Sequence, residues 1–598
     1  MALLSLFPLS PARRFGAVVI LAAAGLHAGP AGAEVPAAQS AATAQALETS
    51  PYGDFLAARH AERSYNAPRA AELFAHTLRH SPDNPALMRQ TMNQMLAAGR
   101  IGDAAKIAGR YLAHEPESVI AGLTLAIDDL ANRKTRAAAD RLEKIPMRGL
   151  GGYFVPLTLG WTKFALGDTE GAVKALEPLG RLQGSQPFVD YHAALMFDLA
   201  GDKERAGQRF EKLAADGFAG YVRFVEAAGS FWERHGERSK ARDIYAEYLK
   251  RRPESTPIEA AAERSGGSAA LPPRLITDAY QGAAEGLHNI ATLLNQEGVP
   301  EIAMMVLQMS INLRRDFDAA LLLKGDILAA MSRREDAIAA YDAIPRSSTL
   351  SWPARLRAAQ LLDQADKGPV AYARLRDMAA ERPTRADPLI TLGDLLRFRK
   401  RFAEAVESYD AAIGRIGAPE QRYWSLYYSR GIALERDKKW PRAEADFLKA
   451  LEFEPDQPLV LNYLGYSWVE KGLHLDRALG MLEKAVRLRP NDGYIVDSLG
   501  WAHYQLKAYD RAVSYLERAV ELMSADSTIN DHLGDAYWRV GRTYEARYQW
   551  SRALLFGPEP EELDKIRKKL AEGLPGGPVK REAEGGGARS KAKGRSGG

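Results

Sequence analysis

Alanine recurs along this chain at nearly constant spacing, and this regularity limits the folds that are open to it. Fourteen alanines occupy the same step of a repeating unit, and nine of the thirteen intervals between them are 34 residues; the others are 35, 62, 38 and 35. A period in this range is typical of a stacked array of small structural units. The alanines are Ala70, Ala104, Ala138, Ala172, Ala206, Ala241, Ala303, Ala337, Ala371, Ala405, Ala443, Ala478, Ala512 and Ala546.

The residues around these alanines repeat with them. A small residue precedes the alanine by twelve positions (thirteen for Ala478) in every unit but one, where Met92 stands. A bulky apolar residue follows by four positions in every unit except at Ala108, and proline follows by twelve in seven units. Examples of the small residues are Gly393, Gly431, Gly465, Gly500 and Gly534, and of the bulky residues Tyr409, Phe447, Leu482, Leu516 and Trp550.

This pattern predicts that each unit is a pair of helices of about fourteen residues, an ordinary helix length. The small residue and the alanine face each other where the helices cross, because axes at the near end of the usual range of roughly 8–10 Å leave no room for larger side chains. The bulky residue lies one turn beyond the alanine on the same face. Proline ends the second helix. A single pair cannot bury its apolar face, so the pairs stack and share a core.

These residues resemble the tetratricopeptide repeat. The clearest copies are residues 461–490 and 496–520, followed by 431–455 and 532–554, and the resemblance spans roughly 51–556, most strongly after 385. The resemblance implies an all-α, right-handed superhelix, an α-solenoid of about fourteen helical pairs.

The breaks in the period predict the division of the chain. Residues 251–275, within the 62-residue interval, are rich in Pro, Gly and Ser, which favours a linker; a degenerate repeat with an exposed loop is the alternative. The expected parts are a signal peptide at 1–33, a linker at 34–50, an N-terminal array at 51–253, a linker or irregular insert at 254–283, a C-terminal array at 284–556, a capping helix at 557–574 and a disordered basic tail at 575–598.

The first residues have the features of a secretion signal. Arg13 and Arg14 precede twelve apolar residues, 15–26, and the small residues 31–33 predict cleavage near Ala33. Twelve apolar residues are too few to span a bilayer, and no other stretch is apolar enough. The chain has no cysteine, so it has neither a disulfide framework nor a lipid-anchor cysteine. We expect an exported protein of the bacterial periplasm.

The charge of the chain gives no reason to expect nucleic acid as a partner. Of the formal net charge of +4, the leader carries +2 and residues 573–598 carry +4, which leaves −2 over residues 34–572. The array is therefore close to neutral, and its global charge does not favour nucleic-acid binding.

No catalytic motif is present, and we expect a non-enzymatic protein without metal or cofactor. His76 and His80 stand four residues apart on a predicted helix, a spacing that could hold a metal ion, but a third ligand is missing. A solvated helix face is the simpler explanation for these two histidines.

The first helix of each unit is expected to line a groove that binds protein partners. Aromatic side chains beside Asn and Asp offer apolar area together with groups that bind peptide backbone. Packing of the tryptophans between repeats is the alternative, and the aspartates favour a cationic or backbone-donating partner. The candidate residues are Asn462, Tyr466, Asp497, Trp501, Tyr504, Asp531, Asp535, Trp538 and Arg539.

Residues 425–556 are similar to exported bacterial repeat proteins that act as adaptors for a C-terminal-processing periplasmic protease. This resemblance implies a scaffold that binds the protease and presents peptidoglycan hydrolases to it. The adaptors of that group are outer-membrane lipoproteins, and the absence of cysteine here removes that anchor. The alternative is a scaffold for envelope assembly or exopolysaccharide export.

Overall fold

The computed structural model describes residues 50–215, 221–267, 271–417 and 420–577, and within these ranges it contains helices and no strand. The predicted signal peptide and most of the basic tail lie outside them. The helices are α2 (Pro51–Arg63), α3 (Ala67–His80), α4 (Pro85–Ala97), α5 (Ile101–Tyr111), α6 (Val119–Ala131), α7 (Thr135–Leu142), α8 (Gly151–Ala165), α9 (Thr169–Ala175), α10 (Glu177–Gly180), α11 (Gln186–Ala200), α12 (Lys203–Ala215), α13 (Val222–Arg234), α14 (Arg238–Arg251), α15 (Thr256–Gly266), α16 (Ala279–Gln296), α17 (Pro300–Leu313), α18 (Asp318–Ala330), α19 (Arg334–Asp342), α20 (Ser351–Gln364), α21 (Gly368–Glu381), α22 (Asp387–Phe398), α23 (Phe402–Ile413), α24 (Trp424–Arg436), α25 (Trp440–Phe453), α26 (Pro458–Glu470), α27 (Leu475–Leu488), α28 (Gly493–Gln505), α29 (Tyr509–Leu522), α30 (Ser527–Arg539), α31 (Thr543–Leu555) and α32 (Pro560–Glu572).

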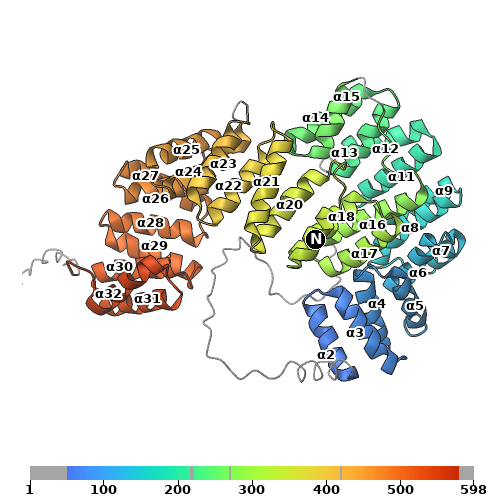
Figure 1. The fold of residues 1–598 in the computed structure, drawn as a ribbon, viewed down its shortest axis with the longest axis horizontal. Helices are drawn as coiled ribbons and strands as arrows, with labels where there is room; N and C mark the ends of the chain where they lie inside the picture. Colours follow the sequence, from blue (N-terminus) through green and yellow to red (C-terminus); the bar gives the residue numbers. More distant parts are fainter. Residues whose placement is uncertain (1–49, 216–220, 268–270, 418–419, 578–598) are drawn as a thin grey trace, which may run out of the picture. The chain divides into compact units, whose positions relative to one another are not determined.

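The helices form pairs, as the period predicts (Figure 1). Within the described residues fourteen pairs run from α2–α3 to α30–α31, while α10, α15 and α32 stand outside the pairing. Each pair turns through a residue with positive φ that lies five positions before the repeating alanine, or four before Ala478. Six of these residues are glycine and eight are not, although the left-handed region costs a non-glycine residue roughly 1–2 kcal/mol. The all-α solenoid of about fourteen pairs is confirmed.

The small residue of the first helix and the bulky residue of the second helix make the close contact that the pattern predicts. A Cβ atom added to Gly431 would lie 2.7 Å from the ring of Phe447, and one added to Gly500 would lie 2.7 Å from Leu516. All fourteen repeating alanines are fully buried. This contact sets the spacing of the two helices in each pair.

The residues that the structure describes form two compact units, divided between Arg374 and Leu375. The division falls within α21 and not at 254–283, the segment between the two predicted arrays. The reason lies in the position of α16 and α17, which pack on helices of the first unit that lie far away in the sequence.

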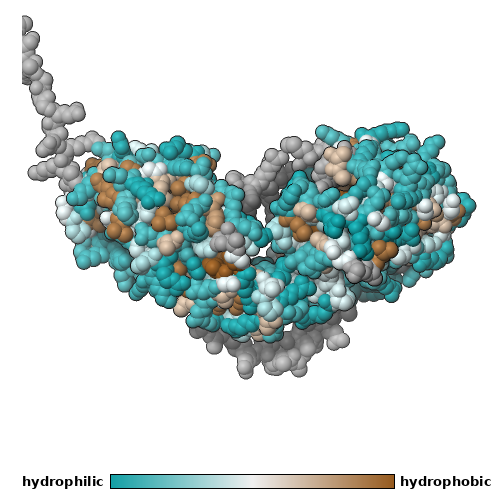
Figure 2. Space-filling view, turned by 90° about the horizontal axis from the view of Figure 1, so that it is seen from above, coloured by the Kyte–Doolittle hydropathy of each residue, from teal (hydrophilic) through white to brown (hydrophobic). Residues whose placement is uncertain are grey.

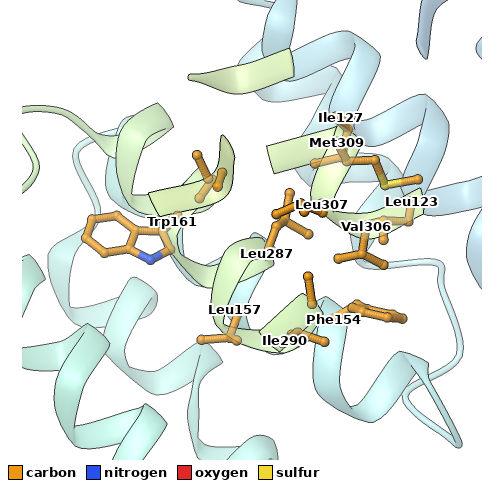
Figure 3. Close-up of a cluster of buried hydrophobic side chains, with 14 of the residues drawn as sticks. Leu123, Ile127, Phe154, Leu157, Trp161, Leu287, Ile290, Val306, Leu307 and Met309 are labelled. Atoms are coloured by element: carbon orange, nitrogen blue, oxygen red, sulfur yellow. The ribbon is translucent and has the colours of Figure 1, made fainter. Parts of the chain in front are cut away.

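The α16–α17 pair packs against first helices of earlier pairs and so lies inside the N-terminal unit. Helix α16 contacts α8 and α11, while α17 contacts α4 and α6. Figure 3 shows the resulting core, in which Leu287 and Ile290 of α16 lie near Phe154 and Leu157 of α8. From the period alone, α16–α17 is one more repeat stacked after the preceding ones. In the structure this pair instead packs against the first helices of earlier pairs.

A polar network holds α16 within this core. Glu285 is fully buried and accepts hydrogen bonds from Arg223 of α13 (2.5 Å) and from the hydroxyl of Tyr191 of α11 (3.0 Å). Burial raises the pKa of Glu285, but Arg223 outweighs this effect and lowers it to about 2. Nearby, Trp161 of α8 donates to Nδ1 of His192 (3.0 Å), which requires that this nitrogen carry no proton. The carboxylate of Glu285 is therefore paired, although no water reaches it.

The described part of the segment 254–283 contains two helical stretches, and residues 271–278 before the second stretch are not helical. Helix α15 packs on α13 and α14, and α16 begins at Ala279. Residues 271–278 are tied to the array, since Ser230 donates to the carbonyl of Pro273 (2.9 Å) and Arg314 donates to that of Leu275 (3.2 Å). The capping helix expected at 557–574 is α32, which packs on α31.

Hydrophilic residues cover most of the face in Figure 2, with hydrophobic residues in small patches between them. None of the helices described by the structure is long and apolar enough to cross a membrane.

Replacing Ala512 with leucine should destabilise the C-terminal unit. Ala512 is fully buried beside the contact of α28 with α29, so the larger side chain must push the two helices apart. Overpacking of this kind costs roughly 1–3 kcal/mol. Thermal unfolding followed by circular dichroism measures the loss, and an unchanged melting temperature would contradict the predicted tight crossing. Ala571→Leu, at an exposed position of α32, is the control.

His192→Gln should weaken the dependence of stability on pH. Burial lowers the pKa of His192 to about 4, whereas an unfolded histidine titrates near 6.5. Between these pH values the unfolded chain binds the additional proton, so the free energy of unfolding falls as the pH falls. His288 shares this behaviour, because burial also lowers its pKa to about 4.

Denaturant unfolding midpoints over this pH window test the effect. The slope should be smaller for His192→Gln than for the native chain or for His60→Gln, a control at an exposed position of α2. Equal slopes for all three proteins would show that His192 takes up its proton normally in the folded state.

Candidate protein-binding surface of the C-terminal unit

The candidate surface is formed by the first helices of the last five pairs, α22, α24, α26, α28 and α30, and is here called the first-helix face. These helices lie next to one another: α22 contacts α24, and α28 contacts both α26 and α30. The glycine of each first helix faces the second helix of its own pair. The residues three before and one, four and five after the glycine, which include all the candidate residues, therefore lie on other sides of the helix.

The centre of the first-helix face is an aromatic stack. The ring of Trp501 lies parallel to that of Tyr504, with centroids 4.7 Å apart, and parallel to that of His532, 3.9 Å apart. The indole nitrogen of Trp501 donates to Glu470 of α26 at 2.5 Å. Trp501 and Tyr504 remain half-buried. The stack therefore joins three neighbouring helices and still presents aromatic surface.

A buried ion pair supports this stack. Nδ1 of His532 lies 3.0 Å from Oδ2 of Asp497, and both side chains are buried. Burial lowers the pKa of His532, but the carboxylate of Asp497 outweighs this effect and the net pKa is raised. Asp497 thus holds the imidazole in place under Trp501 and is not itself available to a partner.

Asn462 and Tyr466 extend the surface along α26. Both are half-buried, and Oδ1 of Asn462 has no hydrogen-bond partner among the described residues. Burial, followed by the charges of Glu470 and Asp497, raises the pKa of the Tyr466 hydroxyl, so that this group keeps its proton as a donor. Oδ1 of Asn462 is shielded from the surface, so it is the Tyr466 hydroxyl that can donate to a peptide carbonyl.

Helix α32 covers the last part of the face. Its Lys569 reaches both Asp531 and Asp535 of α30, at 2.7 and 2.8 Å. Trp550 of α31 also donates to Asp535, at 2.9 Å. Burial and the neighbouring charge of Asp531 raise the pKa of Asp535 to about 6. The cation that the two aspartates require is thus supplied by the chain itself.

The segment after α32 covers Trp538 and Arg539. Trp538 is buried, and a Cβ atom on Gly573 would lie 2.1 Å from its ring. Arg539 donates to the carbonyls of Pro575 (2.8 Å) and Gly577 (3.3 Å) and to the hydroxyl of Tyr504 (3.3 Å).

Four of the predicted groove residues are therefore not on open surface. Asp531, Asp535 and Trp538 lie under α32 and the turn after it, and Asp497 is paired beneath the stack. Asn462, Tyr466, Trp501, Tyr504 and Arg539 stay partly exposed. Whether these residues bind a partner remains a prediction.

Three side chains that shape the surface are absent from the predicted set. Glu470 fixes Trp501, His532 completes the stack, and Lys569 neutralises two aspartates. His532 is the residue of α30 next to the predicted Asp531, so the repeat register places it in the first helix. Nothing in the local sequence of α32 singles out Lys569 among its neighbouring basic residues Lys565, Arg567 and Lys568.

The described residues contain no group of three or more His, Asp or Glu side chains that could hold a metal ion. His76 lies against the buried carboxylate of Asp54, and His80 contacts the carbonyl of His76 at 3.2 Å. Their spacing reflects contacts within the helical pair α2–α3.

Residues 390–458 and 471–527 match the family model described as tetratricopeptide repeat. Tetratricopeptide repeats therefore form a large part of the C-terminal unit. The matched ranges include Asp497, Trp501 and Tyr504, and Asn462 and Tyr466 lie in the interval between them.

The chain is similar to the TPR repeat-containing protein PA4667 of Pseudomonas aeruginosa, with 28% identity over 154 residues. The match covers 26% of this chain and about a quarter (25%) of that protein.

Solved structures with similar folds include the APC/C hetero-tetramer Cut9–Hcn1 (16% identity, 77% of this chain and 98% of the other, TM-score 0.33). Others are a tetratricopeptide repeat protein from Parabacteroides merdae (14%, 48% and 98%, TM-score 0.33) and MamA from Desulfovibrio magneticus (20%, 29% and 96%, TM-score 0.25).

Two substitutions should move the pKa of Asp535 in opposite directions. Asp531→Asn removes a like charge and should lower it from about 6, whereas Lys569→Met removes the stabilising cation and should raise it. A ¹³C titration of aspartate-labelled protein measures the shift, with the signal assigned by Asp535→Asn. If the pKa of Asp535 shifted in the same direction in both variants, Lys569 would not lie between the two carboxylates.

Proposed function

We propose that this chain is an exported, non-enzymatic adaptor that binds other proteins on the part of the first-helix face left open by α32. In this role it presents cell-wall hydrolases to a C-terminal-processing protease in the periplasm. Tetratricopeptide repeats are protein-binding scaffolds in general. The specific role rests on the predicted leader and on the similarity of residues 425–556 to exported protease adaptors.

The observation that carries the proposal is the half-buried row formed by Asn462, Tyr466, Trp501 and Tyr504. Aromatic side chains bury large apolar area at small entropic cost, and Trp and Tyr dominate the binding energy of many interfaces. The row continues onto residues of α30 that are covered by α32 and the turn after it. These contacts within the chain are an example of how this face can bind a polypeptide segment.

The covering segment indicates the chemistry of the partner. It places one lysine between two carboxylates, a glycine over a tryptophan ring, and two backbone carbonyls on Arg539. On α26, Glu470 accepts a hydrogen bond from Trp501 and lies at an exposed position. We therefore expect the partner to present an extended segment with a lysine or arginine directed at Glu470.

Affinity capture with the purified chain from a periplasmic extract tests the proposal. The native chain should recover a processing protease or a wall hydrolase. The double variant Tyr466→Ala, Trp501→Ala should bind the purified partner at least about tenfold more weakly, a loss of about 1.4 kcal/mol. Tyr544→Ala is the matched control, because Tyr544 is 86% exposed on α31, a second helix away from this face.

Circular dichroism of each variant separates lost binding from lost folding. A reconstituted reaction then tests the adaptor role, since the hydrolase should be degraded faster by the protease when the chain is present. Recovery of an outer-membrane pore in place of a protease or hydrolase would favour the alternative, a scaffold for envelope assembly or exopolysaccharide export. Equal binding by the double variant would refute the assignment of the surface.

A further inference from the structure

The N-terminal unit contains a cavity of about 550 Å³ between its first two pairs and the helices α17–α19. One wall comes from the turn between α2 and α3 and from α4, and the other comes from α17, α18 and α19, more than 200 residues later. Helix α17 packs directly on α4 at this cavity. Its volume lies within the range of about 300–1,000 Å³ that is typical of small-molecule sites.

The walls of this cavity are mainly apolar and adaptable. Met304 and Met305 of α17 and Met331 after α18 line it together with Ile302 and Leu328. Methionine has a flexible, polarisable side chain that adjusts to ligands of different shapes. Such a lining suits an unbranched or loosely shaped apolar group.

Most polar groups at the cavity are already engaged within the protein. Glu62 accepts hydrogen bonds from Arg59 (2.6 Å) and Gln94 (3.2 Å), and Gln308 donates to the carbonyl of Ala97 (3.2 Å). Arg333 is paired with Asp336 and also donates to the carbonyl of Tyr65 at 2.8 Å. Glu301 lies at an exposed position at the start of α17, where water solvates it.

Lys324 of α18 is the exception. It lines the cavity, is half-buried, and makes no ion pair within the described residues. Burial lowers the pKa of its amine, and Asp336, the carboxylate that opposes this effect, is already paired with Arg333. The cavity therefore combines an apolar body with one cation that lacks a counter-ion. A partly desolvated charge without a partner is unfavourable, and an anionic ligand would stabilise it.

We propose that this cavity binds a small apolar molecule with a single carboxylate, such as a medium-chain fatty acid, with the carboxylate on Lys324. The apolar chain lies against Met304, Met305 and Leu328. This site belongs to the N-terminal unit and does not depend on the first-helix face of the C-terminal unit.

Isothermal titration of the full chain with decanoate, below the concentration at which decanoate aggregates, tests the proposal. We expect one site per chain. Lys324→Met keeps an unbranched side chain but removes the charge, and should weaken binding at least about tenfold. Ala339→Phe places a ring in the cavity without changing Lys324, and should abolish binding. Lys174→Gln, at an exposed lysine of α9, is the matched control and should bind as the native chain does.

Two further probes test the role of charge. Decanol, which is uncharged, and decyltrimethylammonium, which is cationic, should each bind at least about tenfold more weakly than decanoate. Equal affinity for decanol, or full affinity of Lys324→Met for decanoate, would overturn the role of Lys324. Unchanged binding by Ala339→Phe would overturn the location of the site. Thermal unfolding of each variant confirms that the unit is folded, and decanoate should raise the melting temperature of the native chain but not that of Ala339→Phe.

Discussion

The close crossing of the two helices within each pair is the contact on which the rest of this structure depends. A glycine or another small residue on the first helix receives a large side chain from the second, as Phe447 packs over Gly431. The buried alanine one turn earlier keeps the helices close along the same line. Because protein interiors are densely packed, this contact leaves little freedom in the orientation of either helix. It thereby decides which residues of the first helix remain free to meet neighbouring pairs or other molecules.

In each unit, the side of the first helices that does not contact the second helices must be covered by other helices, exposed to solvent or bound by a partner. The two units differ in how much of this side is covered. In the N-terminal unit α16 and α17 pack on α4, α6, α8 and α11, and Glu285 is neutralised by Arg223. In the C-terminal unit α32 covers only the last pair, with Lys569 between two aspartates. Both coverings obey the rule that a buried charge is paired. The aromatic row between α26 and α28 stays partly open, and it is there that we propose partners bind.

The fold could be predicted from the sequence to a large extent, and the candidate site in part. The period gave the number of helical pairs and the helix on which each candidate residue lies, because helical geometry converts spacing directly into a face. Asn462, Tyr466, Trp501 and Tyr504 are partly exposed, as expected. Asp531, Asp535 and Trp538 are covered, because a lysine and a glycine more than 30 residues away reach them. An aspartate on an inner face has the same sequence signature whether its cation comes from a partner or from the same chain.

The sequence by itself determined the repeating unit: two helices, a tight crossing between them, and a turn at a constant distance from the alanine. These features follow from contacts between residues close together in the chain, and local spacing encodes them. Only the tertiary structure decided that α16–α17 packs on the first helices of earlier pairs and that α32 covers the last pair. It also decided that a cavity lined by Lys324 remains beside α4. These outcomes depend on which apolar faces meet across long stretches of chain. Stacked pairs of nearly equal sequence do not specify that choice locally, since every face of this kind gains a similar free energy from being buried.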